Sequence, residues 1–277
     1  MAPIEIKTGQ QIRWMREAGL VVAQIHKALR EAAQPGVSLK DLDAVSEKTI
    51  RECGAHSNFL GYYGFPATAC ISVNETVVHG IPDNTVLKAG DLVSFDCGAY
   101  VLREGKQWHG DAAFTMIVGG EGSAEAERLN RVTEEAMWAA LASLVNGKRI
   151  SAIGEAVEEV VAANATDQWE AGIIEEYTGH GIGTAMHQPP EILNYRARGI
   201  TPKLKRGMVL AVEPMLVDGS IETEVMDDDW TVKTVDRSLA AHWEHTVALT
   251  DGGIWVLTAP DGGEAGLAPY GITPSPA

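Results

Sequence analysis

Two apolar segments that we expect to be buried strands each end in a carboxylate. Residues 92–96 (LVSFD) and 209–213 (VLAVE) have this pattern. An ionised carboxylate that is buried without a partner costs several kcal/mol, or its pKa shifts until the group is neutral. Asp111, His180 and Glu244 lie in similar apolar or glycine-rich settings. A fold that gathers Asp96, Glu213 and these three residues would provide what two adjacent divalent cations need.

Composition and charge exclude several classes of protein. The chain has 277 residues, of which 45% are hydrophobic and 22% charged, as in an ordinary globular enzyme. The net charge of −16 argues against nucleic acid or anionic lipid as a partner. Its three cysteines form no CxxC pair, no signal peptide is evident, and no apolar run approaches the ~20 residues that span a bilayer. We therefore expect a cytoplasmic protein.

Apolar residues at three- and four-residue spacing predict two pairs of helices. Thr8 is expected to cap the first helix, and Ser38 the second, which should end near Gly54. The second pair is expected to begin near Glu127, to break at residues 146–147, and to resume at Ser151. Strands are expected at residues 69–73, 77–79, 92–96, 112–118, 208–213, 243–249 and 252–257.

The end of the chain has a different composition. Between Ala259 and Ala277, eight of 19 residues are Gly or Pro and no periodicity is visible, which predicts a tail. Residues 1–258 are expected to form a single catalytic domain.

The order helix, helix, strands occurs twice, and short motifs repeat with it. An H-x-x-P turn begins at His79 and again at His187, and a Leu-Lys-x-Gly turn precedes both Asp96 and Glu213. The motifs keep their order and a nearly constant separation. A pseudo-twofold axis between the halves would bring both sets of histidines and carboxylates into one central cleft.

The residue types indicate the chemistry. Oxygen-rich ligation with few nitrogens and no thiolate suits Mn²⁺, Fe²⁺, Co²⁺ or Zn²⁺. Two such ions need bridging carboxylates, and together they lower the pKa of a shared water and polarise a carbonyl. This combination describes metal-assisted amide hydrolysis at a chain terminus. His79 and His187 do not show ligand spacing, and their repeated positions favour hydrogen-bonding roles beside the metals.

With these motifs the chain resembles the methionine aminopeptidases of the short bacterial class (type I). The resemblance runs from about Ile6 to Leu257. It is carried by an opening helix with MREAG at residues 15–19, by CISVNE at 70–75 and HGIP at 79–82, and by GHGIG at 179–183, EPM at 213–215 and EHT at 244–246. The resemblance implies an α+β "pita-bread" fold, in which two α-β halves enclose a metal site between central antiparallel strands.

The resemblance also implies roles for single residues. Asp111 and Glu244 would bridge two divalent ions, drawn from Co, Mn, Fe, Zn or Ni. Asp96 would complete one metal site, and His180 with Glu213 the other. Further implied roles are a proton shuttle for Glu213, a contact with the substrate amide nitrogen or leaving group for His79, and a hydrogen bond to the scissile carbonyl oxygen for His187.

The implied methionine pocket is apolar, as an unbranched thioether requires. We expect it to be lined by Phe59, Tyr62, Phe65, Cys70, Met186 and Trp230. Phe59 and Phe65 depart from the family, which often has Cys and Tyr there. The link from Asp96 to Asp111 is also longer than the family's usual hairpin, with its extra residues around 102–106. Gly181 is expected to permit close backbone approach beside His180.

The resemblance implies that the partners are the N-termini of nascent polypeptides with a small second residue. It leaves transient association with the ribosome open, and it favours a monomer. Two alternatives share the fold. An Xaa-Pro aminopeptidase or prolidase generally carries a large N-terminal domain, and only a short segment precedes the substrate-binding stretch here. A catalytically silent binding protein would typically lose ligands, and none is missing. A dinucleotide site is disfavoured because the G-x-G-x-x-G spacing is absent.

Overall fold

Side-chain caps start the helices close to the residues that the sequence predicts. The computed structural model describes residues 3–145 and 148–277. Thr8 begins α1 (Gly9–Ala32) through a capping box with Gln11, and the Ser38 hydroxyl begins α2 (Leu39–Glu52). Both caps confirm the prediction, because a cap depends only on neighbours in the chain.

The second helical pair begins earlier than predicted. Ser123 caps α3 (Ala124–Ala142), whereas the start was expected near Glu127. The following helix, α4 (Ala152–Asn164), begins beside Ser151 as expected, although the Ser151 side chain makes no capping hydrogen bond. The break predicted at residues 146–147 lies outside the described residues.

A large antiparallel sheet carries the predicted carboxylates. Its strands lie in the order β1-β4-β5-β14-β9-β7-β8, with β2 beside β4 and β15 beside β14. Their bounds are β1 His56–Ser57, β2 Ala69–Val73, β4 Leu92–Arg103, β5 Lys106–Ile117, β7 Gly179–Gly181, β8 Gln188–Ile192, β9 Val209–Val212, β14 Glu244–Leu249 and β15 Ile254–Val256. Segments that are far apart in the sequence therefore become neighbours at the centre of the sheet.

Asp96 does not end its strand, which corrects the prediction. The strand β4 continues past it to Arg103 and pairs residue by residue with β5, down to a turn in which Glu104 and Gly105 have φ values of 52° and 71°. The long link between Asp96 and Asp111 is thus a regular hairpin. Its pairing with β5, which a single segment cannot reveal, extends the strand.

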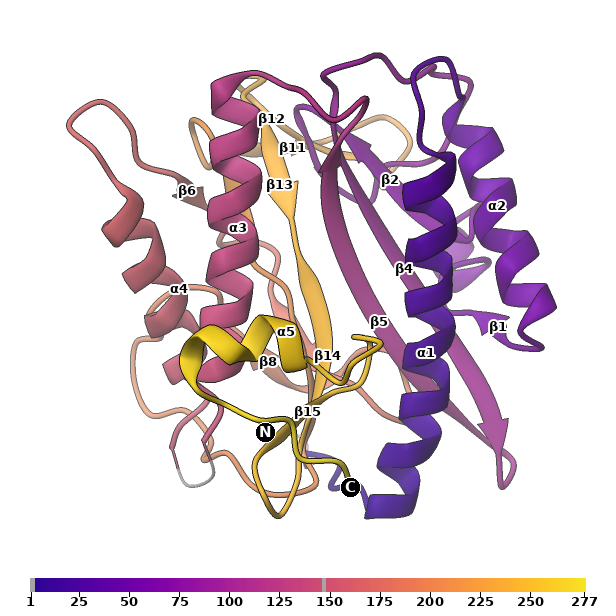
Figure 1. The fold of residues 1–277 in the computed structure, drawn as a ribbon, viewed down its shortest axis with the longest axis vertical. Helices are drawn as coiled ribbons and strands as arrows, with labels where there is room; N and C mark the ends of the chain where they lie inside the picture. The colour runs from indigo at the N-terminus through magenta and orange to yellow at the C-terminus, as the bar shows by residue number, and fades with distance from the viewer. Residues whose placement is uncertain (1–2, 146–147) are drawn as a thin grey trace.

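Two small sheets and two helix pairs complete the fold. The small sheets have the orders β13-β10-β6 and β11-β12-β3. Figure 1 shows α1 and α2 at the right of the view and α3 and α4 at the left, one helix pair for each half that the repeated order predicts. The added strands are β3 Thr76–Val78, β6 Gly172–Ile173, β10 Met215–Val217, β11 Thr223–Val225, β12 Val232–Thr234 and β13 Ala240–His242.

Residues 259–277, which the sequence predicts to be a Gly/Pro-rich tail, pack onto the rest of the chain. They contain the short helices α5 (Glu264–Leu267) and η2 (Ala268–Tyr270), and Leu267 is fully buried. Arg16 on α1 donates hydrogen bonds to four carbonyl oxygens, including those of Ala259 and Pro260 at 2.5 and 2.8 Å. A side chain from the first helix thus supplies the order that local composition does not predict.

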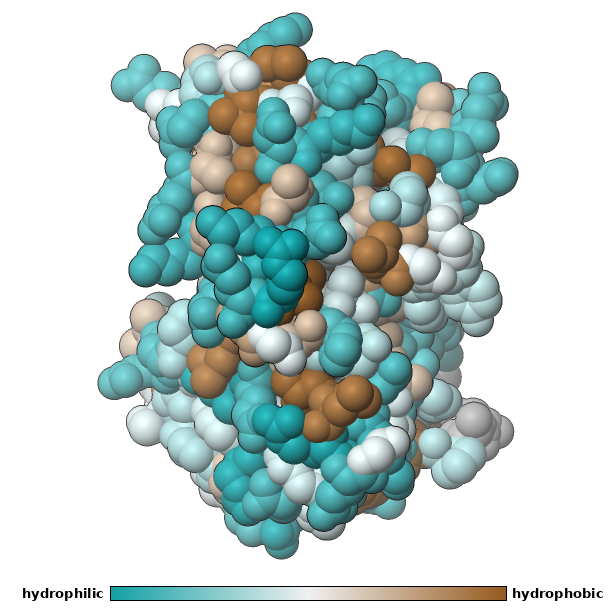
Figure 2. Space-filling model, turned by 90° about the vertical axis from the view of Figure 1, so that its right-hand side faces the viewer, coloured by the Kyte–Doolittle hydropathy of each residue, from teal (hydrophilic) through white to brown (hydrophobic). Residues whose placement is uncertain are grey.

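One face of the molecule is mostly hydrophilic. Figure 2 shows hydrophilic residues over most of one face, with apolar residues in small, separated patches. Within residues 3–145 and 148–277, no helix is long and apolar enough to cross a membrane.

Candidate metal centre and active site

Five neighbouring strands each bring one predicted metal ligand to the same face of the sheet. Asp96 on β4 pairs with Ala113 on β5, and Ala113 pairs with Glu244 on β14. Asp111 is two residues from Ala113, so its side chain points to the same face. The register therefore gathers Asp96, Asp111 and Glu244.

The remaining two ligands follow from the next pairings. Val212 on β9 pairs with His245, so Glu213, the residue after this strand, lies beside Glu244. His180 on β7 pairs with Ala211, which is two residues from Glu213 and therefore shares its face. All five predicted ligands thus meet, although they come from distant parts of the sequence.

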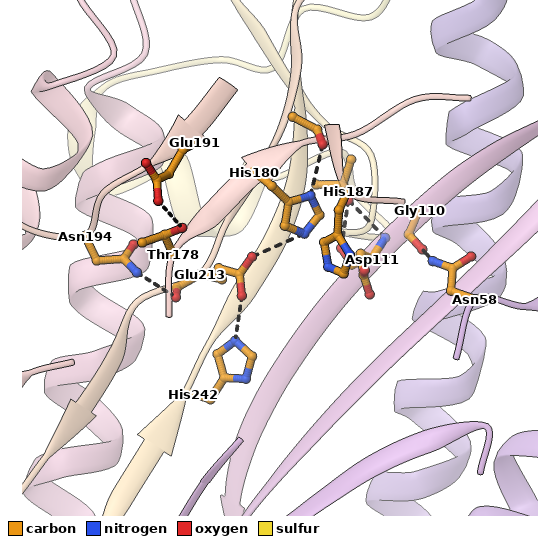
Figure 3. Close-up of polar contacts among 12 residues, drawn as sticks. Asn58, Gly110, Asp111, Thr178, His180, His187, Glu191, Asn194, Glu213 and His242 are labelled. Carbon is orange, nitrogen blue, oxygen red and sulfur yellow. Dashed lines mark hydrogen bonds and ion pairs between the residues drawn. The ribbon is translucent and has the colours of Figure 1, made fainter. Parts of the chain in front are cut away.

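Ligand atoms in this cluster are close enough to share ions. Asp111, His180 and Glu244 offer atoms that all lie within 4.8 Å of one another, and so do Glu213, His242 and Glu244. His180 Nε2 lies 3.3 Å from Glu213 Oε1, as Figure 3 shows. Two overlapping groups with a shared glutamate suit a pair of ions.

The tautomer of His180 favours a cation at this place. Its Nδ1 lies 3.0 Å from the Gly181 carbonyl oxygen, which can only accept, so Nδ1 carries the proton. In the neutral ring Nε2 then presents a lone pair toward Glu213. Glu213 Oε1 has no hydrogen-bond partner among the described residues, and one oxygen each of Asp96, Asp111 and Glu244 shares this property.

Burial and mutual repulsion act on the carboxyl groups. Asp111, Glu213 and Glu244 are 4%, 9% and 2% exposed. Burial raises the pKa of Asp96 to about 7, and burial together with neighbouring carboxylates raises the pKa values of the other three well above their ordinary range. Burial lowers the pKa of His180 to about 3, so its ring stays neutral. Four acids in this state need positive charge to ionise together.

The residues present therefore fit divalent metal ions. Unpartnered carboxylate oxygens and a neutral imidazole nitrogen are ligands that Mn²⁺, Fe²⁺, Co²⁺ and Zn²⁺ accept. Asp96, Asp111, His180 and Glu244 lie within strands, and Glu213 follows directly after β9.

Two further histidines border the centre. His79 adopts a left-handed conformation with φ of 59°, which is rare for a residue other than glycine and is concentrated at functional sites. His187 packs against His180 with ring centroids 4.3 Å apart, and its Nδ1 lies 2.8 Å from the Tyr62 hydroxyl oxygen. Both histidines thus lie beside the metal ligands, as the repeated H-x-x-P turns predict.

An apolar pocket adjoins the carboxylates. Phe59, Phe65, Cys70 and Met186 are buried together with Ala67, and Tyr62, Ile81 and Trp230 pack against them. Phe65 and Trp230 meet edge to face with ring centroids 5.1 Å apart. The residues predicted to line a methionine pocket therefore form one contiguous apolar cluster, and its role in binding methionine stays a prediction.

All thirteen predicted site residues line a single cavity of about 60 Å³, together with Val78. The roles of these residues stay predictions. His242 was missed, although it contributes to the second ligand group. Its position two residues before Glu244 on a short strand was the one sequence signal available.

The fold and the site together define a metal-dependent hydrolase with its ligands on adjacent antiparallel strands. The family model of metallopeptidase family M24 matches residues 13–251. This is most of the chain, so the protein belongs to metallopeptidase family M24.

Two relatives with similar sequences are methionine aminopeptidases. Methionine aminopeptidase 1 of Mycobacterium tuberculosis is 49% identical over 246 residues, which cover 88% of this chain and 91% of the relative. Methionine aminopeptidase 1 of Bacillus subtilis is 42% identical over 252 residues, covering 91% and 98%.

Solved structures agree with the predicted fold. The methionine aminopeptidase of Thermotoga maritima superposes with a TM-score of 0.86 at 37% identity, covering 92% of this chain and 99% of that one. The prolidase of Pyrococcus furiosus shares the fold at 21% identity and a TM-score of 0.69, but this chain covers only 65% of its length. The prediction of a pita-bread fold is confirmed.

Proposed function

We propose that this protein removes the N-terminal methionine from nascent proteins and peptides, and that it favours a small second residue. One observation carries the proposal: an apolar pocket suited to an unbranched side chain opens directly onto the carboxylate cluster. The relatives named methionine aminopeptidase, at 42–49% identity, support the same substrate.

The proposal includes two divalent ions for each chain. Asp96, Asp111, His180, Glu213 and Glu244 would hold them. Ions bound there would supply the Lewis acidity that lowers the pKa of a water to about 7. Glu213, whose oxygens lie in the same cavity, would accept the proton of the attacking water.

The histidines would then act on the substrate. If the Tyr62 hydroxyl donates to Nδ1 of His187, the proton of that ring is on Nε2, where it can donate to the scissile carbonyl oxygen. His79, which lines the same cavity, would contact the amide nitrogen or the leaving group. The methionine side chain would lie among Phe59, Phe65 and Cys70, which keep water away from it.

We further infer a monomer in the cytoplasm that acts on the N-termini of nascent chains, with any ribosome contact transient. Cys53, Cys70 and Cys97 are all free thiols, which supports a reducing compartment.

The test compares a Met-Ala-Ser peptide with a matched Xaa-Pro peptide. The protein is stripped of metal and restored with Mn²⁺, Fe²⁺, Co²⁺, Zn²⁺ or Ni²⁺ in turn, and free amino acid is measured. We expect metal-dependent release of methionine from the first peptide alone. Cleavage of the Xaa-Pro peptide alone would instead indicate an Xaa-Pro aminopeptidase or prolidase. Cleavage of neither peptide with metal bound would favour a silent binding protein.

A further inference from the structure

His242 contacts the metal-ligand cluster from the interior of the protein. It is the last residue of β13 and only 1% exposed. Its Nε2 lies 3.7 Å from Glu213 Oε2 and has no hydrogen-bond partner among the described residues. Figure 3 shows Glu213 between two imidazoles, with His180 facing one carboxylate oxygen and His242 the other.

The backbone of His242 is fixed by the strands that carry two of the ligands. Its N–H donates to the hydroxyl oxygens of Ser94 and Thr115, at 3.2 and 3.0 Å, and the Thr115 hydroxyl donates to its carbonyl oxygen at 2.8 Å. Ser94 is on β4 with Asp96, and Thr115 is on β5 with Asp111. Any shift of His242 would therefore break contacts with the strands of the site.

A separation of 3.7 Å is too long for a hydrogen bond. Buried polar atoms nearly always have a partner, so an unpartnered imidazole nitrogen that faces a carboxylate calls for an explanation. Glu213 Oε2, at 3.7 Å, is the carboxylate oxygen that approaches this nitrogen, while Glu244 offers an oxygen within 4.8 Å of the ring's ligand atom. The backbone of Glu213 is already held, because Asn194 Nδ2 donates to the Glu213 carbonyl oxygen at 3.1 Å. The side chain, whose Oε1 has no hydrogen-bond partner among the described residues, is the part that remains to be oriented.

We propose that His242 is a positioning residue for Glu213. Its Nε2–H donates to Oε2 once the Glu213 side chain closes the 3.7 Å gap, so that Oε1 stays directed toward His180 and the ions. Carboxylate ligands of metal sites are usually held by such outer hydrogen bonds. This inference rests on the proposed metal-dependent function and deepens it, because it assigns the residue that orients the proposed proton shuttle.

The test uses the affinity for Mn²⁺ or Co²⁺, measured by calorimetric titration of metal-free protein. His242→Leu removes the donor, and we expect affinity to fall by roughly 10- to 100-fold, as for other outer-shell partners. His242→Gln keeps an N–H donor but is a poor ligand for these ions, and we expect it to stay close to the parent protein. His242→Met, which also lacks a donor, serves if the leucine variant does not fold. In each folded variant kcat should change in parallel with affinity.

His26→Leu is the matched control. His26 is likewise a buried histidine, but its Nε2 contacts the Ala112 carbonyl oxygen at 3.0 Å instead of a carboxylate. This variant should lose thermal stability and keep its metal affinity. Unchanged affinity in folded His242→Leu or His242→Met would overturn the proposal. Equal losses in the glutamine and leucine variants, with an altered visible spectrum of bound Co²⁺, would make His242 a direct ligand instead and also overturn it. A parent protein that binds no divalent ion would refute the proposed function itself.

Discussion

Asp111 illustrates at the residue scale how function and stability oppose each other. Burial, followed by the charges of Asp96 and Glu213, raises its pKa, so the ionised form is disfavoured without a cation. We predict that Asp111→Asn lowers kcat/KM by at least about 10²-fold, because a lost metal bridge removes several kcal/mol of transition-state stabilisation. In EDTA the variant should melt no lower than the parent protein, since the amide replaces a carboxyl group whose ionised form is already disfavoured there. Full activity of this variant would refute the metal assignment.

Substitution of His79 should lower the catalytic rate without changing the affinity for metal. His79 lines the cavity but belongs to neither group of candidate ligands. We predict that His79→Ala keeps the affinity for Mn²⁺ or Co²⁺ and lowers kcat by about 10²-fold, a typical cost of losing a proton-transfer or hydrogen-bonding side chain. The exposed His56 provides the control variant His56→Ala. A parallel loss of metal in His79→Ala would mean that His79 is a ligand.

The affinity for metal ions should rise as the pH rises. Burial raises the carboxyl pKa values, to about 7 for Asp96, so metal-free protein retains protons that the ions must displace. His180, with its pKa lowered to about 3, stays neutral throughout and does not oppose this effect. Affinity should therefore rise with pH through neutrality, by on the order of tenfold per unit for each displaced proton. Calorimetry in two buffers of different ionisation enthalpy counts these protons, and a pH-independent affinity would contradict the prediction.

At the scale of single elements, β7 places His180 through a close backbone contact. A Cβ on Gly181 would lie 2.2 Å from the Pro189 carbonyl oxygen, so a side chain there must displace β7 or β8. We predict that Gly181→Val costs about 10²-fold in kcat/KM, as expected when a ligand moves by about 1 Å. Gly9→Ala is the control, because its nearest neighbour is 3.5 Å away. Unchanged turnover and metal content in Gly181→Val would refute the argument.

The elements differ in how well the sequence predicts them. Helices α1 and α2 were predicted with their caps, because Thr8 and Ser38 act on residues three positions away. Short strands such as β7 and β8 were not predicted, because they contain Gly and Pro and form only by pairing with a neighbour. The continuation of β4 beyond Asp96 was missed for the same reason.

For the whole molecule, metal removal should lower stability. The carboxylates lie between strands from both halves of the chain, so bound ions link those halves. We predict that metal at about 100 times its dissociation constant adds about 2.7 kcal/mol to the free energy of unfolding. Thermal melts with EDTA and with added Mn²⁺ measure this difference. The same melts on Asp111→Asn should show a smaller gain.

The sequence by itself determined which residues are candidates for the chemistry. Asp96, Asp111, Glu213 and Glu244 were conspicuous because a charge in an apolar or glycine-rich segment needs a partner. The helix caps and the repeated H-x-x-P turns could also be recognised from residues close together in the sequence. Only the tertiary structure decided that five adjacent strands direct these groups to one face, that Arg16 holds residues 259 and 260, and that His242 faces Glu213. The physical reason is that strand register and burial depend on partners distant in the chain, which local patterns do not encode.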